Sequence, residues 1–355
     1  MGFQNARIFV AGHRGLVGSA LVRQLRKSGY ENLLLRRKEE LDLRDREAVL
    51  AFFEEERPQV VLMAAGVVGG IKANDSFPVE FLADNLRIEL NVIEGAWRTG
   101  VEKYVFLGSS CIYPKFADQP IREEALLTGA LEPTNQWYAV AKIAGIKLGE
   151  AYRKEYGLRA ISLMPTNLYG IQDNFDLEES HVLPAMMRKF HLGRCVMEGD
   201  LDGVARDERR FGGIPDWLLE QLGIRREGEG FALDEKRSGP RVVLWGTGRP
   251  RREFLFVDDL AEACIFLMEN YDGEEMVNVG TGEDVSLMVL ADLIQEVVGF
   301  EGEVVWDRSY PDGTPRKLLD VSRIKALGWT PKVGLKEGVE RVYEWYRREV
   351  GLEDR

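Results

Sequence analysis

Short apolar runs alternate with stretches of helical periodicity through the first half of the chain. The runs occupy residues 8–10, 33–35, 60–62, 105–107 and 160–163. After the first run, Val17, Leu21 and Leu25 recur every four residues, a spacing that places them on one face of a helix. Continuous apolar runs are typical of strands buried on both faces, and their alternation with helices indicates a parallel sheet covered on both sides. The pattern therefore predicts an α/β fold with a doubly wound parallel sheet of the Rossmann type.

The alternation breaks after Pro165, where loops and longer helical patterns take over. These patterns cover residues 182–192, 285–298 and 335–350. We predict a nucleotide-binding domain over residues 1–168, completed by about 253–282. A smaller α/β substrate-binding domain is expected over residues 169–252 and 283–355.

One segment differs in composition from the rest of the chain. Between Val196 and Arg241, 19 of 46 residues are charged, a higher share than the 30% of the whole sequence. Inside it, residues 217–224 carry enough apolar positions for a short amphipathic helix. We expect an insertion at about 196–241. It is either a solvated excursion or lid with mobile flanks, or a contact for a partner or a second subunit.

Charge and cysteine content narrow the function classes. The chain has 355 residues, with 47 Lys and Arg against 59 Asp and Glu, which gives a formal net charge of −12. Such a surface repels phosphate backbones, so we expect no nucleic-acid partner, although a local basic pocket can hold a small anionic ligand. The three cysteines show no pairing pattern, which predicts neither disulfides nor a metal site and indicates a reduced, cytoplasmic protein. Neither a signal-peptide core nor a membrane-spanning run is expected.

A glycine-rich turn follows the first predicted strand and opens the first predicted helix. Its residues are Gly12, His13, Arg14, Gly15, Leu16, Val17 and Gly18. A sharp turn in this position brings unpaired backbone N–H groups and the helix dipole against a pyrophosphate. The strand before it and the helix after it are the context that makes such a motif specific, so we predict a dinucleotide site.

The second predicted strand ends in cations rather than in an acidic residue. These cations are Arg36, Arg37 and Lys38. An Asp or Glu at this place accepts from the ribose hydroxyls of NAD, whereas a 2′-phosphate requires cations. Together with Arg14 they form a candidate phosphate clamp, and we expect NADP rather than NAD. The alternative is ordinary solvated charge beside the acidic residues that follow.

A second group of polar residues lies at the carboxyl end of the fourth predicted strand and on the helix that follows. Ser109 comes directly after that strand, and Tyr138 and Lys142 lie four residues apart. Residues i and i+4 share a helix face, so we expect the ammonium of Lys142 to lower the pKa of the Tyr138 phenol. A phenol with its ordinary pKa of about 10 is a poor acid–base group at neutral pH. Since Ser109 can hydrogen-bond a carbonyl, the three side chains predict proton transfer at a substrate carbonyl.

These motifs resemble the extended short-chain dehydrogenase/reductase family, and the local sequences resemble its GDP-L-fucose synthase branch in particular. The resemblance covers nearly the whole chain except about 196–241. It rests on residues 12–18, 108–115, 131–135, 138, 142–147, 164–170, 173–175 and 311–317. It implies conversion of GDP-4-keto-6-deoxy-D-mannose to GDP-L-fucose, through epimerisation at C3 and C5 followed by NADPH-dependent reduction at C4.

The resemblance also implies roles for individual residues. Ser109, Tyr138 and Lys142 would serve the reduction, while Cys111 and His181 would supply the base and the acid of the epimerisation. A thiol and an imidazole can both exchange protons near neutral pH. Cofactor contacts are implied for Leu107, Gly108, Lys142, Pro165, Asn167, Leu168 and His181, besides the glycine loop, Arg37 and Lys38. Substrate contacts are implied for Lys189, Trp245, Arg252 and Asp312.

Two alternative functions stay open at this point. A sister GDP-ketosugar enzyme that epimerises one centre, as in colitose biosynthesis, would carry the same catalytic residues. A non-catalytic NADP-binding protein is the rival from another class, but it would have no need of the Ser–Tyr–Lys set. A 4,6-dehydratase is disfavoured, because Ser110 and Cys111 stand where that activity needs an acidic pair.

The family resemblance further implies a homodimer that pairs through flanking helices. The candidate helices contain residues 78–98 and 136–156. Two positions depart from the family pattern: Val67 stands where Lys is usual, and Lys38 stands where Arg is usual. A lysine keeps the charge but loses the two-pronged geometry with which a guanidinium binds phosphate.

Overall fold

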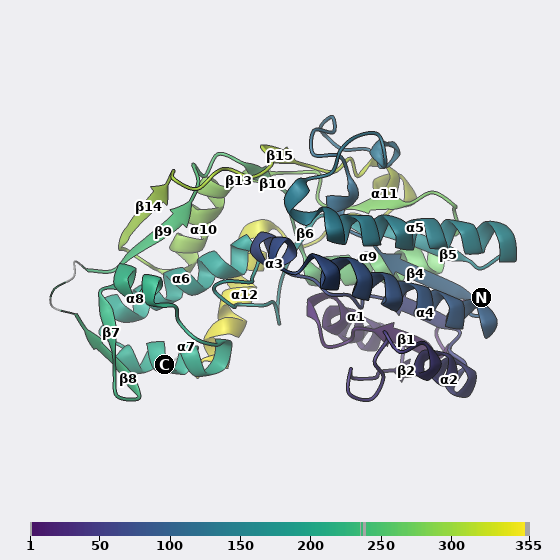
Figure 1. The fold of residues 1–355 in the computed structure, drawn as a ribbon, viewed down its shortest axis with the longest axis horizontal. Coiled ribbons are helices and arrows are strands. Elements are labelled where there is room, and N and C mark those ends of the chain that lie inside the picture. Colours follow the sequence, from purple (N-terminus) through teal and green to yellow (C-terminus); the bar gives the residue numbers. More distant parts are fainter. Residues whose placement is uncertain (1, 235, 237–238, 352–355) are drawn as a thin grey trace. The chain divides into compact units, whose positions relative to one another are not determined.

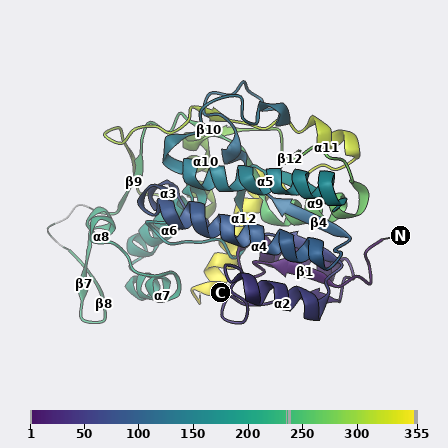
Figure 2. The ribbon, with the colours of Figure 1, turned by 45° about the vertical axis from the view of Figure 1, so that its right-hand side comes forward.

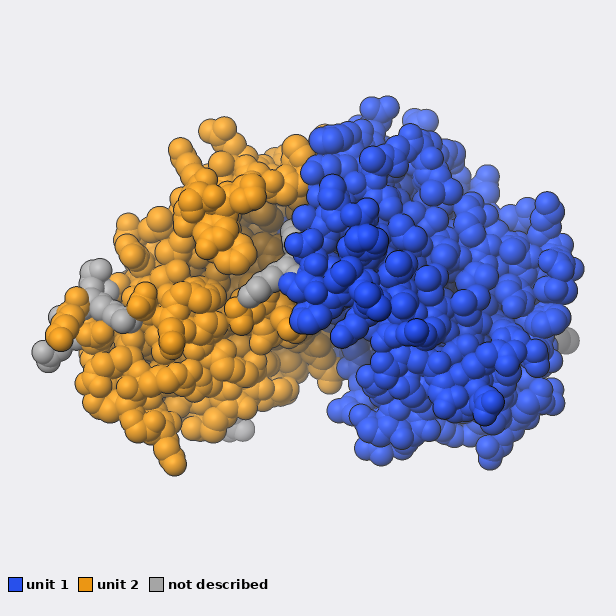
Figure 3. Space-filling model, in the orientation of Figure 1, with its two compact units in different colours: residues 1–168, 253–283, 317–333 blue, residues 169–252, 284–316, 334–355 orange. Residues whose placement is uncertain are grey.

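The computed structural model describes residues 2–234, 236 and 239–351. The chain divides into two compact units, each made of several chain segments (Figure 3). Unit 1 comprises residues 1–168, 253–283 and 317–333, and unit 2 comprises residues 169–252, 284–316 and 334–355. Residues 317–333, which we predicted to lie in the substrate-binding domain, therefore belong with the nucleotide-binding part.

Unit 1 is built on a six-stranded parallel sheet with the order β12-β5-β4-β3-β1-β2 (Figure 1). Its strands are β1 (Ile8–Ala11), β2 (Leu33–Leu34), β3 (Val60–Met63), β4 (Lys103–Leu107), β5 (Ala160–Pro165) and β12 (Val277–Val279). Each predicted apolar run forms one of these strands, and β1, β3, β4 and β5 are buried along their whole length. The strand order reverses at β1, with β2 on one side and β3 on the other, so the carboxyl ends there form the edge where such sheets bind ligands.

Two layers of helices cover the sheet of unit 1. The helices and short strands are α1 (Leu16–Lys27), α2 (Arg46–Glu56), α3 (Ile71–Ser76), η1 (Glu80–Asp84), α4 (Asn85–Arg98), η2 (Ser110–Ile112), η3 (Glu123–Ala125), η4 (Pro133–Asn135), α5 (Gln136–Tyr156), β6 (Asn167–Tyr169), β11 (Phe254–Phe256), α9 (Val257–Asn270) and α11 (Ser322–Leu327). One layer places α4 between α2 and α5, and in the other α1 packs against α9 (Figures 1 and 2). The helix ends follow from the sequence: Asp45 caps α2 by accepting from the N–H groups of Glu47 and Ala48, and Gly157 ends α5 with a positive φ.

The buried carboxylate of Glu253 ties residues 317–333 into unit 1. Its Oε1 accepts from the backbone N–H groups of Thr281 at 2.6 Å and Gly282 at 2.7 Å, and its Oε2 accepts from the N–H of Leu319 at 3.0 Å. Leu319 also forms a β-bridge with Ile121 and belongs to the core of this unit. These partners lie far apart along the chain, so periodicity could not indicate that they meet.

Unit 2 combines helices with short strands. Its elements are α6 (Val182–Met197), α7 (Leu201–Phe211), α8 (Asp216–Leu222), β7 (Ile224–Glu227), β8 (Gly230–Leu233), β9 (Arg241–Trp245), β10 (Arg251–Arg252), β13 (Val285–Ser286), α10 (Leu287–Val298), β14 (Glu303–Asp307) and α12 (Leu335–Glu349), with β15 (Arg316–Lys317) at its boundary. β9 and β14 pair in parallel, while β10 and β13 pair antiparallel. α6 packs against α7 and α10, and α10 packs against α12.

The predicted insertion is folded rather than a solvated excursion. α6 continues to Met197 instead of ending near residue 192, and α7, α8 and the β7–β8 hairpin follow it. Val204, Leu218 and Ile224 are buried in one cluster with Leu192 of α6. The expectation of a solvated excursion was wrong, because most of the charges lie on exposed faces of short elements whose other faces are packed. The alternative of a contact with a partner or a second subunit stays a prediction. Residues 235, 237 and 238 of this segment lie outside the described residues.

Candidate active site

The glycine loop of unit 1 has the backbone shape that a dinucleotide site requires. Gly12 adopts φ +80°, a conformation that L side chains rarely adopt. A Cβ atom on Gly18 would lie 2.0 Å from the carbonyl oxygen of Gly12, so α1 can approach the loop only because this residue has no side chain. Gly15 is the N-cap of α1, and no side chain caps the helix there. The first N–H groups of α1 are therefore available to an anion.

The other residues of the loop fit the same ligand. Leu16 and Val17 pack against the core and anchor α1. Nδ1 of His13 is buried without a hydrogen-bond partner among the described residues, and burial followed by the charge of Arg14 lowers the pKa of this imidazole. Arg14 is exposed. A buried orphan polar atom beside an uncapped helix N-terminus is the environment that a bound dinucleotide would complete.

The predicted phosphate clamp after β2 is partly engaged in ion pairs. The guanidinium of Arg36 bonds to Glu56, and Arg37 bonds through its side chain and its backbone N–H to Glu40, at 3.1 and 2.8 Å. Lys38 is exposed. Ion pairs near the surface are weak, so a 2′-phosphate can replace these carboxylates at small cost. The clamp stays a prediction.

The carboxyl end of β4 brings Ser109 and Cys111 into contact. Gly108 lets β4 approach β5, because a Cβ there would lie 2.5 Å from Sδ of Met164. Ser109 is the N-cap of η2, and its Oγ accepts from the backbone N–H of Cys111 at 3.3 Å and from the Cys111 thiol at 3.0 Å. Cys111 is half-buried and is a free thiol. The turn thus presents a hydroxyl and a thiol side by side at the predicted ligand edge.

Tyr138 and Lys142 lie one turn apart on α5, as predicted. Nζ of Lys142 is 5.7 Å from the centre of the Tyr138 ring and 4.8 Å from that of Phe106. The expected lowering of the Tyr138 pKa is not found. Burial raises this pKa well above its ordinary value, and the charges of Cys111 and Glu89 raise it further. The physical reason is that burial, the largest effect, disfavours the charged phenolate, and that the ammonium of Lys142 already has a counter-ion.

That counter-ion is Glu89 of α4, a residue that the sequence analysis missed. Its Oε1 lies 3.2 Å from Nζ of Lys142, and both side chains are almost fully buried, at 2% and 4% exposed. Burial raises the pKa of Glu89, while the charge of Lys142 lowers it. The available signal was a lone acidic residue on the face of α4 that is buried, together with Asn85 one turn earlier on the same face.

The predicted nicotinamide-end residues lie where β5 passes into β6. Pro165 ends β5, and Asn167 and Leu168 begin β6. The Nδ2 group of Asn167 donates to the backbone carbonyl of Glu253 at 2.7 Å. This bond fixes the side-chain amide of Asn167, whose contact with a cofactor stays a prediction.

In unit 2, α6 carries His181 and Lys189. His181 is the N-cap of α6, and its exposed side chain makes no capping hydrogen bond. Lys189 is buried: its Nζ donates to the carbonyl of Val243 at 3.3 Å and lies 5.0 Å from the centre of the Trp217 ring. Burial lowers the pKa of Lys189 to about 8. A desolvated cation of this kind favours an anionic ligand.

The other predicted substrate residues of unit 2 lie at the ends of β9 and β10. The Trp245 ring stacks on Tyr310, which the sequence analysis missed, with centroids 4.5 Å apart and planes 9° apart. Both rings are partly exposed, at 55% and 44%. Nζ of Lys189 lies 5.8 Å from the Trp245 ring, so these residues form one aromatic and cationic group.

Asp312 has a structural role in the described chain. Its two carboxylate oxygens accept from the N–H and the hydroxyl of Thr247 at 2.8 and 2.7 Å, and these bonds lower its pKa. The guanidinium of Arg252 lies near Gly313, where an added Cβ would be 3.4 Å from a terminal nitrogen, and it also donates to the carbonyl of Arg251. Direct contact of either residue with a substrate stays a prediction.

The remaining cysteines are buried away from this chemistry. Sγ of Cys195 lies 3.5 Å from Nε2 of His191, and burial raises the pKa values of Cys195 and Cys264 to about 12. Both are inert as nucleophiles at neutral pH. Among the described residues, no three His, Cys, Asp or Glu side chains gather as a metal site would require. The described helices also include none that is long and apolar enough to cross a membrane.

Comparison with known proteins gives close matches over nearly the whole chain. The NAD dependent epimerase/dehydratase family matches residues 8–211 and 231–280, a match that omits residues 212–230 of the predicted insertion. GDP-L-fucose synthase 1 of Arabidopsis thaliana is 51% identical, covering 99% of this chain and 96% of the relative. GDP-L-fucose synthase of Escherichia coli is 46% identical over 96% of both chains.

Two further proteins place these matches in context. A GDP-D-glycero-L-gluco-heptose synthase from Campylobacter jejuni, crystallised in the presence of NADPH, has a TM-score of 0.86 at 38% identity and covers 97% of this chain and 99% of its own. GDP-L-colitose synthase of Yersinia pseudotuberculosis, the activity named as an alternative above, is 31% identical over 97% of this chain and 98% of its own. The similarity to this enzyme is lower than that to the two fucose synthases.

Proposed function

Because the chain belongs to the NAD dependent epimerase/dehydratase family and, within it, to the GDP-L-fucose synthases, we propose that it converts GDP-4-keto-6-deoxy-D-mannose to GDP-L-fucose with NADPH. The observation that carries this proposal is the turn after β4, where the Cys111 thiol contacts the Ser109 hydroxyl beside the Tyr138–Lys142 pair. A reductase needs the hydroxyl, the phenol and the ammonium. Only an enzyme that also moves a proton on carbon gains from the thiol.

The glycine loop and the uncapped start of α1 hold the pyrophosphate of the cofactor in this proposal, and Arg37 and Lys38 bind its 2′-phosphate. Leu107, Gly108, Pro165 and Leu168, at the end of β4 and at β5 and β6, would contact the cofactor toward its nicotinamide end. Bound NADPH supplies the hydride for C4. For binding of the cofactor, the chain itself contributes backbone N–H groups, cationic side chains and the tight turn of the glycine loop.

Epimerisation needs a base on one face of the sugar and an acid on the other. Cys111 removes the proton from the carbon next to the ketone, and its contact with Ser109 orients the sulfur. We assign the return of a proton to His181, the N-cap residue of α6, because an imidazole can exchange protons near neutral pH. The adjacent ketone stabilises the carbanion formed between these steps.

Reduction then needs one proton for the oxygen at C4. Ser109 hydrogen-bonds this oxygen, and Tyr138 donates the proton. A phenol is protonated at neutral pH even at its ordinary pKa, and burial raises the pKa of Tyr138 further, so this residue carries the proton that a donor requires. Lys189, Trp245 and Arg252 bind the GDP part, where cations meet the diphosphate and the indole packs on a ring.

Solvent-deuterium labelling tests this function. We expect the protein, the ketosugar and NADPH in deuterated water to yield GDP-L-fucose with deuterium at both C3 and C5, located by NMR. Tyr138→Phe should slow reduction at least about 100-fold and still allow deuterium incorporation, while Cys111→Ala should stop incorporation. Tyr152→Phe, on the same helix, is the matched control. Deuterium at a single centre would identify the colitose-type activity instead, and loss of both activities in Tyr138→Phe would contradict the division of roles.

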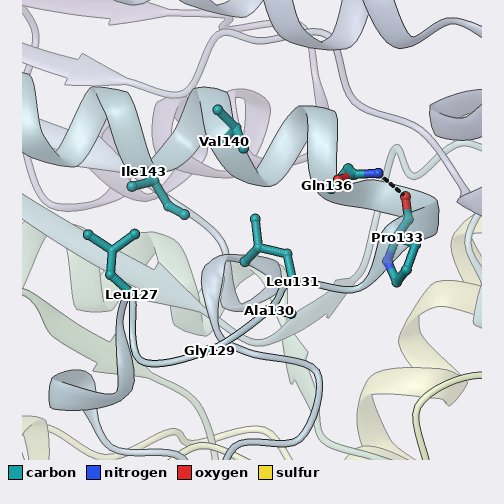
Figure 4. Close-up of a pocket in the computed structure, with 8 residues that line it drawn as sticks. All are labelled: Leu127, Gly129, Ala130, Leu131, Pro133, Gln136, Val140 and Ile143. Carbon is teal, nitrogen blue, oxygen red and sulfur yellow. Dashed lines mark hydrogen bonds between the residues drawn. The ribbon is translucent and has the colours of Figure 1, made fainter.

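A homodimer through α4 and α5 is part of the proposal. Both helices expose apolar side chains, including Leu90 at 47%, Val140 at 43% and Tyr156 at 48%. Val140 also lines an apolar groove of about 550 Å³ between α5 and residues 127–133 (Figure 4). Exposed apolar area of this kind favours burial against a second copy. Val140→Glu should convert the dimer to a monomer in analytical ultracentrifugation, while Val289→Glu, at an exposed valine of α10, should not.

We also propose a cytoplasmic location for the protein. Cys111, Cys195 and Cys264 are free thiols, and thiols persist in a reducing compartment.

A further inference from the structure

Glu89 is a buried carboxylate to which the chemistry above assigns no part. It lies on α4 with its side chain 2% exposed, and its Oε1 is 3.2 Å from Nζ of Lys142 on α5. Neither carboxylate oxygen has a further hydrogen-bond partner among the described residues. Burying a carboxylate is costly, and a carboxylate with so few partners is unusual unless it serves a specific purpose.

The fold makes room for this carboxylate. Gly145, one turn after Lys142 on α5, faces α4, and a Cβ there would lie 2.8 Å from Oε2 of Glu89 and 2.3 Å from the Phe106 ring. Any larger residue would displace the carboxylate. Phe106 also lies under the ammonium of Lys142, at 4.8 Å. The ion pair is therefore enclosed between two helices and a strand, where charges are screened little by water.

The charged and titratable groups around Glu89 and Tyr138 come from three elements. They are Lys142 and Tyr138 of α5, Tyr104 of β4 and Cys111 of η2. The charge of Glu89 raises the pKa values of Tyr104 and Tyr138, in both cases after the larger effect of burial. An unbalanced ammonium beside Tyr138 would act in the opposite direction and favour the phenolate. A phenolate cannot give a proton to a carbonyl oxygen.

We propose that Glu89 is a positioning residue for the Tyr138–Lys142 pair: its carboxylate holds the ammonium of Lys142 in place and balances its charge, so that Tyr138 acts as a proton donor in the reduction. The role of Glu89 in reduction rests on the proposed function. The ion pair and its effect on the Tyr138 phenol, however, exist in the protein without substrate. Direct contact of Glu89 with substrate or cofactor forms no part of it.

Ultraviolet titration of the Tyr138 phenol tests the proposal without substrate. The signal of Tyr138 is the difference between each protein and the same protein carrying Tyr138→Phe. Glu89→Gln keeps the shape of the side chain and removes its charge, so we expect Tyr138 to ionise at least about one pH unit lower. Glu94→Gln changes the same charge on the same helix, at a residue paired with Arg46 and Arg98, and should leave the titration unchanged.

A charge-balanced double variant separates this role from a general structural one. Glu89→Gln combined with Lys142→Met removes both charges, and the Tyr138 titration should return to within about half a unit of wild type. If Glu89→Gln alone does not fold, the double variant can be titrated in its place, because it contains no unpaired buried charge. In that case a titration in the double variant that differs from wild type would overturn the proposal. A Glu89→Gln protein whose Tyr138 titrates as in wild type would overturn it directly.

Kinetics separate a failure of this proposal from a failure of the proposed function. In Glu89→Gln, the pH at which the rate of NADPH oxidation falls on the alkaline side should decrease by as much as the titration midpoint of the Tyr138 phenol. The rate of deuterium incorporation should stay within about threefold of wild type. A wild-type protein that does not turn over the ketosugar would refute the function, and the titration would still decide the role of Glu89. Turnover with an unshifted pH profile in Glu89→Gln would refute the role of Glu89 alone.

Discussion

Replacing Gly18 by alanine should damage the cofactor site through the backbone itself. The added Cβ would lie 2.0 Å from the oxygen and 2.6 Å from the carbon of the Gly12 carbonyl, and 2.7 Å from Cα of His13. All three atoms belong to the backbone, so no flexible side chain can move away. The loop and the start of α1 must separate by more than about 1 Å to restore ordinary van der Waals contact.

The size of the effect follows from this separation. Overpacking a close contact costs about 1–3 kcal/mol, and a contact made only by backbone atoms belongs at the upper end. We expect Gly18→Ala to lose about 3 kcal/mol of folding free energy in unit 1. If the displaced N–H groups lose a similar amount of interaction with the pyrophosphate, NADPH affinity falls about 100-fold.

Gly15 provides the matched control in the same loop. Its added Cβ would have only the Gly12 oxygen within 4 Å, at 3.6 Å, and its φ of −75° suits any residue. Serine is a better N-cap than glycine by a few tenths of a kcal/mol, so Gly15→Ser should fold at least as stably as wild type. Its side chain nevertheless enters the space where the pyrophosphate approaches α1, so NADPH should bind more weakly.

Two assays measure these quantities separately. Chemical denaturation gives the free energy of unfolding, and quenching of tryptophan fluorescence by NADPH gives the affinity. The expected pattern is that Gly18→Ala loses both stability and affinity while Gly15→Ser loses affinity alone. The reasoning would be refuted by a Gly18→Ala protein that unfolds and binds NADPH as wild type does, or by a Gly15→Ser protein that is the less stable of the two.

Two further predictions concern buried charges in unit 2. Arg188→Met should cost about 3–5 kcal/mol in chemical denaturation, because the fully buried guanidinium bonds to Asp207 at 2.8 Å and its loss leaves that carboxylate unpaired. Adding Asp207→Leu should recover the part of the loss that comes from the uncompensated carboxylate, but not the part from the carbonyls of residues 175, 211 and 212, to which Arg188 also donates; a double variant no more stable than Arg188→Met would contradict this account. Burial raises the pKa of Asp173 to about 7, so the folded state holds this proton more tightly than the unfolded chain, and wild-type stability should fall as the pH rises from about 4 to 7. Asp173→Asn should remove that contribution, which makes it progressively more stable than wild type over this range; a constant difference between the two would show that Asp173 does not titrate there.

Elements with a strong local pattern could be predicted from the sequence. The strands of the parallel sheet followed from apolar runs, and α1 followed from the four-residue spacing after the glycine loop. Tyr138 and Lys142 were placed correctly relative to each other because i and i+4 meet on any helix. The glycine loop could be predicted because the spacing of its glycines is set by the local backbone conformation and not by contacts with residues far along the chain.

Features that depend on distant contacts could not be predicted in this way. The acidic and basic composition of residues 196–241 suggested a solvated excursion, but the apolar residues among those charges pack on α6. The boundary near residue 283 missed the return of residues 317–333, which depends on bonds to Glu253. In each case the deciding partner lies in another element, and periodicity describes only one element at a time.

The sequence by itself determined the α/β class, the dinucleotide loop and the residues able to move protons, since each depends on residue type and local spacing. The tertiary structure alone decided which charges meet. It placed Glu89 of α4 beside Lys142 of α5, and it buried Tyr138, so that the pKa of this phenol is raised rather than lowered as expected. A pKa depends on burial and on the sum of nearby charges, and both are properties of the packed chain rather than of any segment of it.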